Sequence, residues 1–480
     1  MTPPTSTAVA GSATAESKEY FAKRSLKKGT VGWVLLASLG VSYVISGDFS
    51  GWNLGLAHGG FLGLAIAFVA MGAMYACMVL GLAEMSSALP TAGAGYGFAR
   101  RALGKAGGFA TGMAILIEYT CAPAAISIFI AGYIESLGLF PGLDPVVIIG
   151  VCFLLFIGVH LIGVGEALKV MFAITAIALV ALVAFVFGML PHFDATNLFN
   201  LAADGSAGSS TLLPGGMSGI LAALPFGIWF FLAIEGVPLA AEEANDPKKD
   251  MPRGIIAGMS VLVITGLCVL MLAPGGAGAE LMSTSGAPLV DALAAVGESD
   301  LAMFVNYAGL AGLVASFFSI VYAYSRQMFA LSRAGYLPRF LSITGSRKTP
   351  IFALIVPGCI GFLLAAILQD GDILINIAVF GACVSYALMN LSHIVLRKKE
   401  PELPRAYRTP GGVVTTGIAL VLSCVAIVST FFVDTVAACC VLGVFVIAMV
   451  YFVLYARKHL VANAPEEEFA QLEAAEAELR

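Results

Sequence analysis

The sequence predicts an all-α membrane protein with twelve transmembrane helices, and two observations carry this prediction. Of the 480 residues, 59% are hydrophobic and only 11% are charged, and the mean hydropathy is +0.94. A composition this apolar excludes an ordinary soluble domain and is typical of a protein that crosses the bilayer many times. The second observation is the distribution of Lys and Arg, which recur at the intervals that alternate crossings would produce.

Apolar stretches long enough to cross a bilayer recur along the whole chain. About 20 apolar residues are needed for one crossing, and short polar loops separate the stretches. We expect the helices at 31–57, 60–88, 107–134, 146–163, 167–190, 217–240, 253–273, 301–325, 350–368, 373–396, 413–433 and 436–456.

The basic residues predict how these helices are oriented. All 25 Lys and Arg lie in the two tails, at or after the ends of even-numbered helices, or at the foot of helix five (Lys169). The remaining loops carry acidic residues and no basic ones. The positive-inside rule therefore places both termini in the cytoplasm. The N-terminal tail lacks the apolar core of a cleaved signal peptide, and we expect the plasma membrane, as in the bacterial inner membrane.

Two of the predicted helices carry a carboxylate beside glycines. Asp48 lies in helix one between Gly47 and Gly51, and Glu235 lies in helix six beside Gly236. An ionisable residue at membrane depth is a candidate for a functional site, and glycine suggests an interrupted helix. Paired interruptions at corresponding positions of two halves are the best sequence pointer to a transporter site.

Five helices separate the two carboxylates, so the second half would be an inverted copy of the first. The expected organisation is two five-helix repeats followed by two further helices, with a cytoplasmic tail at each end. In order, the segments are the tail 1–30, the first repeat 31–190, an external loop 191–216, the second repeat 217–396, a cytoplasmic loop 397–412, helices eleven and twelve at 413–456, and an acidic tail 457–480.

Four cytoplasmic segments resemble signatures of the amino acid–polyamine–organocation (APC) superfamily of transporters. They occur in the family's order, after helices two, six, eight and ten. They read AEMSSALPTAGAGYGFARRALG (83–104), EEANDPKKDMPRGI (242–255), SRQMFALSRAGYLPRFLS (325–342) and RKKEPELPRAYRTPGG (397–412). The resemblance implies the five-plus-five fold and transport by alternating access. These loops would then be structural or gating elements, and Glu84 would pair with a nearby basic residue.

Within the superfamily, VSYVISGDFSGWNLG (41–55) and IEYTCAPAAI (117–126) look most like ethanolamine permeases. Relatives commonly expose bare glycine backbone at the break in helix one, where an amino acid's carboxylate binds. Here Asp48 stands beside that position and would repel a carboxylate. A small amine without a carboxylate would instead find a counter-charge there.

The resemblance places a set of residues around the substrate. Asp48 is either the ammonium counter-ion or a cap on the broken helix, and Glu118 is either a second anchor or a structural hydrogen-bond partner. Glu235 matches an acid implied in gating and proton coupling. Trp229 takes the position of an aromatic lid, where a cation–π contact competes with ordinary packing. The full expected substrate site is Ser46, Gly47, Asp48, Phe49, Glu118, Trp229, Glu235 and Gly236.

The sequence leaves the coupling ion open. The family glycine of helix six is replaced by Ala233, so we place that break at Gly236. Glu235 and Glu118 could couple transport to protons, and Ser316 and Ser319 could help to hold sodium. No metal ligand set, cofactor motif, P-loop or nucleophile–base pair is recognisable, so we expect no enzyme activity and no nucleic-acid partner.

The expected function is import of ethanolamine, or a similar small amine, by a secondary transporter driven by an ion gradient. The alternative within the family is an amino acid or polyamine permease or exchanger. A sensor or channel that kept the fold is a third hypothesis, although no signalling domain is appended. The sequence does not decide between monomer and homodimer.

Overall fold

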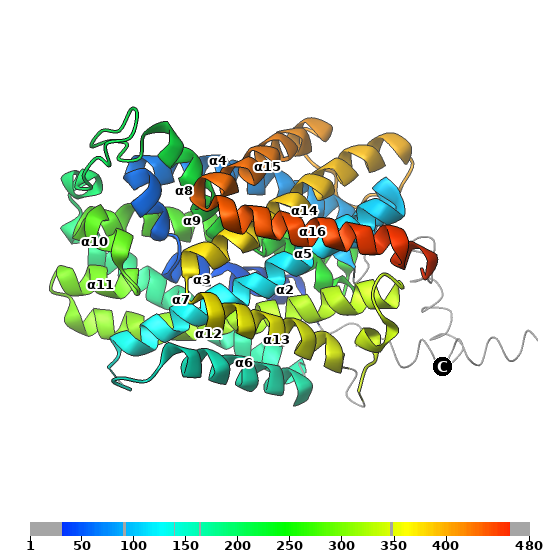
Figure 1. The fold of residues 1–480 in the computed structure, drawn as a ribbon, viewed down its shortest axis with the longest axis horizontal. Helices are drawn as coiled ribbons and strands as arrows, with labels where there is room; N and C mark the ends of the chain where they lie inside the picture. Colours follow the sequence, from blue (N-terminus) through cyan, green and yellow to red (C-terminus); the bar gives the residue numbers. More distant parts are fainter. Residues whose placement is uncertain (1–30, 90–92, 139, 163–164, 346–348, 461–480) are drawn as a thin grey trace, which may run out of the picture.

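The computed structural model describes residues 31–89, 93–138, 140–162, 165–345 and 349–460, and in these ranges the chain forms helices and no β-sheet. Two isolated bridges, Val31 with Ala244 and Thr344 with Pro350, are the extent of β pairing there. Most of the long helices run along the long axis of the molecule (Figure 1). The prediction of an all-α fold is confirmed.

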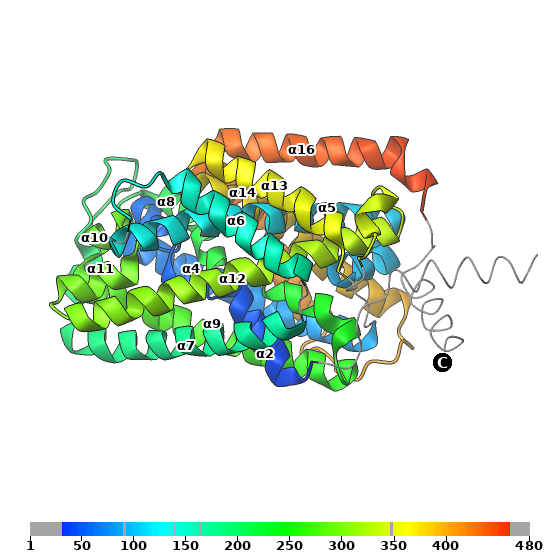
Figure 2. The ribbon, with the colours of Figure 1, turned by 90° about the horizontal axis from the view of Figure 1, so that it is seen from below.

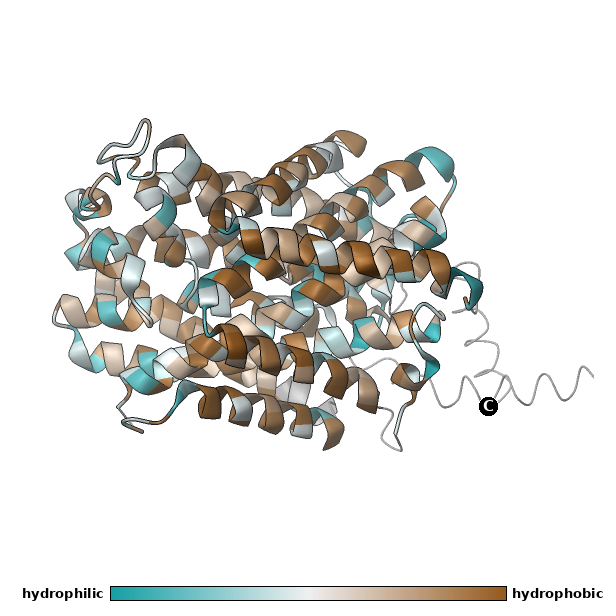
Figure 3. Ribbon diagram, in the orientation of Figure 1, coloured by the Kyte–Doolittle hydropathy of each residue, from teal (hydrophilic) through white to brown (hydrophobic). Residues whose placement is uncertain are grey.

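The number of crossings also agrees with the sequence. Eleven of the described helices are long and apolar enough to span a membrane, and Trp33–Phe49 adds a shorter apolar helix. The protein is therefore a multi-pass membrane protein. Figure 3 shows apolar residues along the middle of the helices and polar residues gathered toward their ends.

The first half of the chain begins with the broken first helix. Its elements are α2 (Trp33–Val44), α3 (Ser46–Phe49), α4 (Leu54–Ala88), α5 (Ala94–Ser136), α6 (Pro145–Ile162) and α7 (Gly165–Met189). Two of these contain a sharp turn at a glycine of positive φ, Gly60 in α4 (63°) and Gly104 in α5 (81°). The segment 54–59 thus completes the first crossing and 61–88 forms the second, whereas 94–103 is a short helix before the third.

The second half begins with another broken helix. Its elements are η1 (Leu190–His192), η2 (Ala195–Phe199), α8 (Gly216–Trp229), η3 (Ile234–Glu243), α9 (Pro247–Ala277), α10 (Ala279–Thr284), α11 (Pro288–Ala295) and α12 (Ser299–Arg333). The short helices α10 and α11 were not predicted, because each is too short to show an apolar period. They lie together at one end of the molecule (Figure 1).

The chain ends with η4 (Arg339–Ser342), α13 (Ile351–Leu368), α14 (Gly371–Lys399), α15 (Val413–Val433), α16 (Thr435–Leu454) and η5 (Ala456–Lys458). The most apolar stretch of α5 is 78% buried, whereas that of α16 is only 22% buried. α5 therefore lies in the centre of the bundle, and α16 lies along its side (Figure 2) with apolar side chains that the bilayer would cover.

The first break lies slightly later than the glycines suggested. Gly47 and Asp48 remain helical within α3, and the backbone leaves the helix at Ser50 (φ −162°) and Gly51 (φ 91°). Asn53 stabilises this turn, because its Oδ1 accepts a hydrogen bond from the N–H of Gly51 and its side-chain amide donates to the carbonyls of Met282 and Ser285.

The prediction that helix six breaks at Gly236 is wrong. α8 ends at Trp229, and the chain turns through Ala233, which adopts a left-handed conformation (φ 78°) although it is not glycine. Gly236 lies within η3 with no positive φ. Its role is steric, since a Cβ there would lie 2.9 Å from the hydroxyl of Tyr119.

Candidate functional site

The two breaks meet in the middle of the bundle through backbone contact. A Cβ on Gly47 would lie 2.4 Å from the carbonyl oxygen of Trp229 and 3.3 Å from Cα of Phe230. The indole N–H of Trp229 donates to the carbonyl oxygen of Ser50 at 2.9 Å. The two interrupted helices therefore pack directly against each other. A residue at one break donates a hydrogen bond to a backbone carbonyl that the other break leaves without its helical partner.

Asp48 is a buried carboxylate without a charged partner in the described part of the chain. Its side chain is 1% exposed and forms no ion pair with the described residues. The hydroxyl of Thr265 in α9 lies beside it and donates to the carbonyls of Val261 and Leu262. It faces α9 at Gly266, where a Cβ would lie 3.4 Å from Asp48 Oδ1, 2.9 Å from the ring of Phe68 and 3.1 Å from the ring of Phe230. A buried unpaired carboxylate is costly unless a cation or hydrogen-bond donor joins it.

A second group of carboxylates lies elsewhere in the core. Tyr119 donates to Glu235 Oε1 at 3.0 Å, and Tyr386 lies 3.0 Å from Glu235 Oε2 and 3.2 Å from Glu118 Oε1. Both carboxyl groups therefore face the same hydroxyl, that of Tyr386. Tyr75 donates to the hydroxyl of Tyr386 at 2.8 Å. We call these five residues the Glu118–Glu235 cluster.

The structure thus brings together only two of the three predicted mid-membrane acids. Glu118 from α5 and Glu235 from η3 share Tyr386, whereas in the described part of the chain no hydrogen bond or ion pair joins Asp48 to either. Asp48 points toward α9 because it is on the opposite side of α3 from Ser46, which faces α12. A shared pocket of three carboxylates is not seen.

Four serines connect the first helix to α12. Ser46 Oγ lies 2.8 Å from Ser316 Oγ, and Ser316 donates to the carbonyl of Tyr43 at 2.6 Å. Ser42 Oγ lies 2.6 Å from Ser319 Oγ and 3.2 Å from the carbonyl of Ala315. These hydroxyls and carbonyls are the type of ligand that a hard cation takes, and in this conformation they bond to one another.

The remaining predicted site residues have packing roles in this conformation. The ring of Phe49 lies against α12, where Cβ atoms on Gly309 and Gly312 would be 2.8 and 3.0 Å from it. Its carbonyl accepts a hydrogen bond from Tyr133 at 2.8 Å. Trp229 is 2% exposed and lies edge-on to Phe129. Trp229 is therefore packed in the core and bonded to Ser50, and its role as a lid stays a prediction.

A polar contact follows each of the two breaks in the chain. Toward the end that carries the basic residues, Glu243 accepts hydrogen bonds from Tyr322 (2.6 Å) and Arg326 (3.2 Å). Toward the other end, His58 Nε2 lies 3.1 Å from Asp372 Oδ2. In this conformation the helices around Asp48 enclose it, and solvent does not reach its carboxylate.

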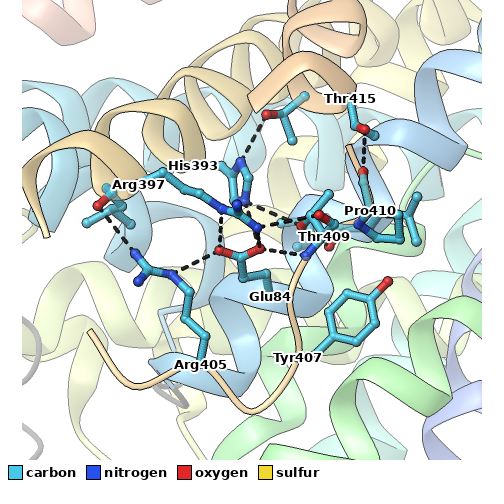
Figure 4. Close-up of polar contacts among 12 residues, drawn as sticks. Glu84, His393, Arg397, Arg405, Tyr407, Thr409, Pro410 and Thr415 are labelled. Carbon is cyan, nitrogen blue, oxygen red and sulfur yellow. Dashed lines mark hydrogen bonds and ion pairs between the residues drawn. The ribbon is translucent and has the colours of Figure 1, made fainter. Parts of the chain in front are cut away.

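Glu84 is the centre of a polar cluster at the basic end (Figure 4). Arg397 binds both of its oxygens (2.9 and 2.6 Å), Arg405 binds Oε1 at 2.9 Å, and His393 lies 3.2 Å from Oε2. The N–H of Thr409 also donates to Oε2 at 2.7 Å. The predicted basic partner of Glu84 is thus confirmed and is multiple, and the cluster attaches the loop after α14 to the end of α4.

Sequence reasoning missed the tyrosines of the core. Tyr75 and Tyr386 are fully buried in α4 and α14, where each brings a hydroxyl into an apolar span. The signal that could have found them is the presence of a hydrogen-bonding tip deep within a predicted crossing, because a buried phenol needs a partner. Glu243 and Arg326 also went unnoticed, although both lie in segments that had been singled out.

Comparison with known proteins agrees with this architecture. The profile of the family described as amino acid permease matches residues 34–468. The chain is 28% identical to a branched-chain amino acid permease of Bacillus subtilis, covering 92% of this chain and 96% of the relative. It is 26% identical to a methylthioribose transporter of the same organism, covering 89% and 93%. An uncharacterised transporter of Rhizobium meliloti is 29% identical, covering 82% and 85%.

A match over nearly the whole chain agrees with twelve crossing segments and two interrupted helices that meet in the core. These findings together fit a transport protein and give no support to an enzyme. The chain belongs to the amino acid permease family.

Proposed function

We propose that this permease carries a small organic amine without a carboxylate, ethanolamine being the fitting compound, and that Asp48 is its counter-ion. The observation that carries the proposal is the buried carboxylate of Asp48, which has no charged partner in the described chain and lies beside the rings of Phe68 and Phe230. An ammonium group there would neutralise the charge, and aromatic faces nearby favour a cation.

Asp48 also argues against a substrate with its own carboxylate. Two carboxylates close together in a region of low dielectric repel each other strongly. The pocket would therefore accept an amino alcohol and reject the zwitterionic amino acid of the same size. The hydroxyl of ethanolamine would bind backbone carbonyls at the two breaks, where the regular helical hydrogen bonds are interrupted.

The second candidate is a permease for apolar amino acids. It is favoured by the relative named as a branched-chain amino acid permease. In that case Asp48 would bind only the amino group, and the substrate carboxylate would bind backbone N–H groups at the breaks. Polyamines form a third group, for which Asp48 and the Glu118–Glu235 cluster would be two separated anionic anchors.

Counterflow in proteoliposomes separates these candidates. Vesicles preloaded with unlabelled ethanolamine should accumulate labelled ethanolamine, and external leucine or putrescine should compete poorly. Accumulation of leucine with no saturable ethanolamine exchange would overturn the amine assignment in favour of the amino acid permease. A channel would give flux without counterflow.

Asp48→Asn tests the role of the carboxylate directly. The variant keeps the shape of the side chain and removes its charge, so ethanolamine affinity should fall at least tenfold, because the amine loses a desolvated counter-ion. Asp300→Asn, at an exposed acidic residue in the first turn of α12, is the matched control and should keep normal affinity. Unchanged affinity in a folded Asp48→Asn protein would remove Asp48 from the substrate site.

For energy coupling we propose a proton rather than sodium, with the Glu118–Glu235 cluster as the proton site. Tyr386 has one hydroxyl proton and faces both carboxyl groups, so it can donate to only one of them at a time. Two buried carboxylates that share one donor repel each other unless one of them binds a proton. The pair is therefore suited to bind one proton and to release it when the helices move.

A further inference from the structure

An open groove at the basic end of the bundle has no part in the site described above. Its volume is about 470 Å³, and it lies between the start of α2, the second turn of α9 and the loop that follows α14. It is lined by Trp33, Pro252, Arg253, Ile256, Ala257 and Tyr407.

The groove has an apolar wall and a polar rim. Ile256 and Ala257 of α9 form the wall, and Trp33 is 42% exposed at the first turn of α2. Trp and Tyr at the ends of spanning helices take positions at the level of the lipid head groups. The lining therefore matches the boundary between head groups and acyl chains.

Arg253 supplies an unused positive charge at this rim. It is exposed, and it makes no hydrogen bond or ion pair with any part of the chain that the structure describes. The nearby acids have partners of their own, since Asp250 accepts from the N–H of Asp246 and Asp246 pairs with Lys249. No described residue competes for the guanidinium, and its planar geometry is well suited to a phosphate.

Tyr407 is held in place on the other side of the groove. Its backbone N–H donates to Ser87 Oγ at 3.3 Å, and its loop is attached to α4 through Glu84 and Thr409 (Figure 4). Partial burial, followed by the charge of Glu84, raises the pKa of Tyr407 above its ordinary value. The phenol therefore keeps its proton and can donate a hydrogen bond.

The groove is a stable feature of helix packing. α2 and α9 are in direct contact next to it, because a Cβ on Gly254 would lie 2.6 Å from Cβ of Leu36 and 3.2 Å from the carbonyl of Trp33. The helices cannot approach further to fill the space. In a membrane, an apolar recess of this kind is covered by lipid.

We propose that this groove binds one anionic phospholipid of the surrounding bilayer, with its phosphate on Arg253, its head group between Trp33 and Tyr407, and an acyl chain along Ile256 and Ala257. A soluble phosphate fits the observations less well, because it would use Arg253 and leave the apolar wall uncovered. The inference concerns a surface away from the substrate, so it stands or falls independently of the transported compound.

Tryptophan fluorescence offers a direct test, because the three Trp residues of the chain differ in exposure. Trp33 is 42% exposed, whereas Trp52 and Trp229 are 0% and 2% exposed. Lipids with brominated acyl chains quench only tryptophans that they touch. The full-length protein is placed in phosphatidylcholine nanodiscs that contain a small fraction of brominated phosphatidylglycerol or brominated phosphatidylcholine. The Trp33→Phe variant retains only the two buried tryptophans, so the difference between its fluorescence and that of the wild type is the signal of Trp33.

Quenching of Trp33 gives an association constant for each brominated lipid. The constant for phosphatidylglycerol should be about five-fold higher than that for phosphatidylcholine. In Arg253→Gln this ratio should fall to about one, and in Arg253→Lys, which keeps the charge, it should persist. Arg408→Gln, at an exposed basic residue one position from Tyr407, is the matched control and should keep the wild-type ratio.

Equal quenching by the two lipids in the wild type would overturn the proposal. So would a preference that survives in Arg253→Gln, since other basic residues would then attract the anionic lipid. Excess inorganic phosphate should leave the preference intact. If it abolishes the preference, the site binds a soluble anion and the assignment to phospholipid is wrong.

Discussion

Gly47 shows how one missing side chain permits the central contact of the molecule. A Cβ at this position would meet the carbonyl oxygen of Trp229 and Cα of Phe230, which are both backbone atoms. No rotation of a side chain could relieve such a clash. The approach of the two breaks therefore depends on glycine at this position, as close backbone contact often does.

Gly47→Ala should push the two breaks apart and lose substrate counterflow, with a loss of stability of about 1–3 kcal/mol from overpacking. Thermal unfolding of the purified protein and counterflow measure the two effects. Gly158→Ala in α6 is the matched control, because a Cβ there meets nothing within 4 Å. Equal behaviour of the two variants would show that the backbone contact is not needed.

Asp48 is the residue on which substrate choice depends in our proposal. Its role as a cap on the broken helix, which the sequence left open, is not seen, because its oxygens accept no hydrogen bond from the described backbone. The expected tenfold loss of amine affinity in Asp48→Asn is thus a prediction about charge, and a loss of fold would not be expected to accompany it.

At the scale of elements, the Glu84 cluster connects three segments that are far apart in the sequence. Glu84 lies in the last two turns of α4, His393 and Arg397 lie in the last two turns of α14, and Arg405 and Thr409 lie in the following loop. Arg101, in the short helix at the start of α5, adds a two-bonded ion pair with Glu400. The basic end of the bundle is held together by charge as well as by apolar packing.

Glu84→Gln should destabilise the protein by about 3 kcal/mol, because removing one member of a buried ion pair leaves the opposite charges uncompensated. The measurement is the shift in the thermal unfolding midpoint in detergent. Glu402→Gln changes an exposed acid of the same loop and should leave the midpoint unchanged. A Glu84→Gln midpoint equal to that of the control would mean that the cluster adds no stability.

At the scale of the whole molecule, the driving force of transport depends on which buried group changes charge between conformations. The serines that join the first helix to α12 satisfy one another without a carboxylate. The Glu118–Glu235 cluster instead has one carboxylate oxygen, Glu118 Oε2, with no described hydrogen-bond partner. We therefore expect protons rather than sodium to drive uptake.

Glu118→Gln tests this expectation, because glutamine still accepts a hydrogen bond from Tyr386 but cannot bind and release a proton. Counterflow of substrate should continue, whereas uptake should no longer accelerate under an inward proton gradient. Ser319→Ala is the companion variant, and its uptake should still respond to the gradient. Proton-driven uptake by Glu118→Gln, or wild-type uptake that requires sodium, would contradict the proposal.

Much of the fold could be predicted because each crossing is specified locally. Its helix bounds follow from the apolar length that a bilayer requires, and they agree with the structure within a few residues at most positions. The break at Ala233 could not be predicted in this way. A non-glycine residue is held there in a left-handed conformation by its surroundings, and sequence patterns favour the nearby Gly236.

The candidate site was predictable as a list of residues but not as an arrangement. Charge at membrane depth identified Asp48, Glu118 and Glu235, since any such residue is exceptional in its segment. Whether these residues meet depends on the direction of each side chain and on packing between distant helices. Glu118 and Glu235 meet through a tyrosine 268 residues from Glu118, whereas Asp48 faces α9.

The sequence by itself determined the class of protein, the number of crossings and the expected orientation, because hydropathy and charge act on each segment independently. The orientation remains a prediction from the positions of Lys and Arg. Only the tertiary structure decided that two acids share one phenol, that a third is left unpaired, and that Glu84 has four partners. These are contacts between distant segments. They depend on which helices pack together, and apolar helices of similar composition do not specify this segment by segment.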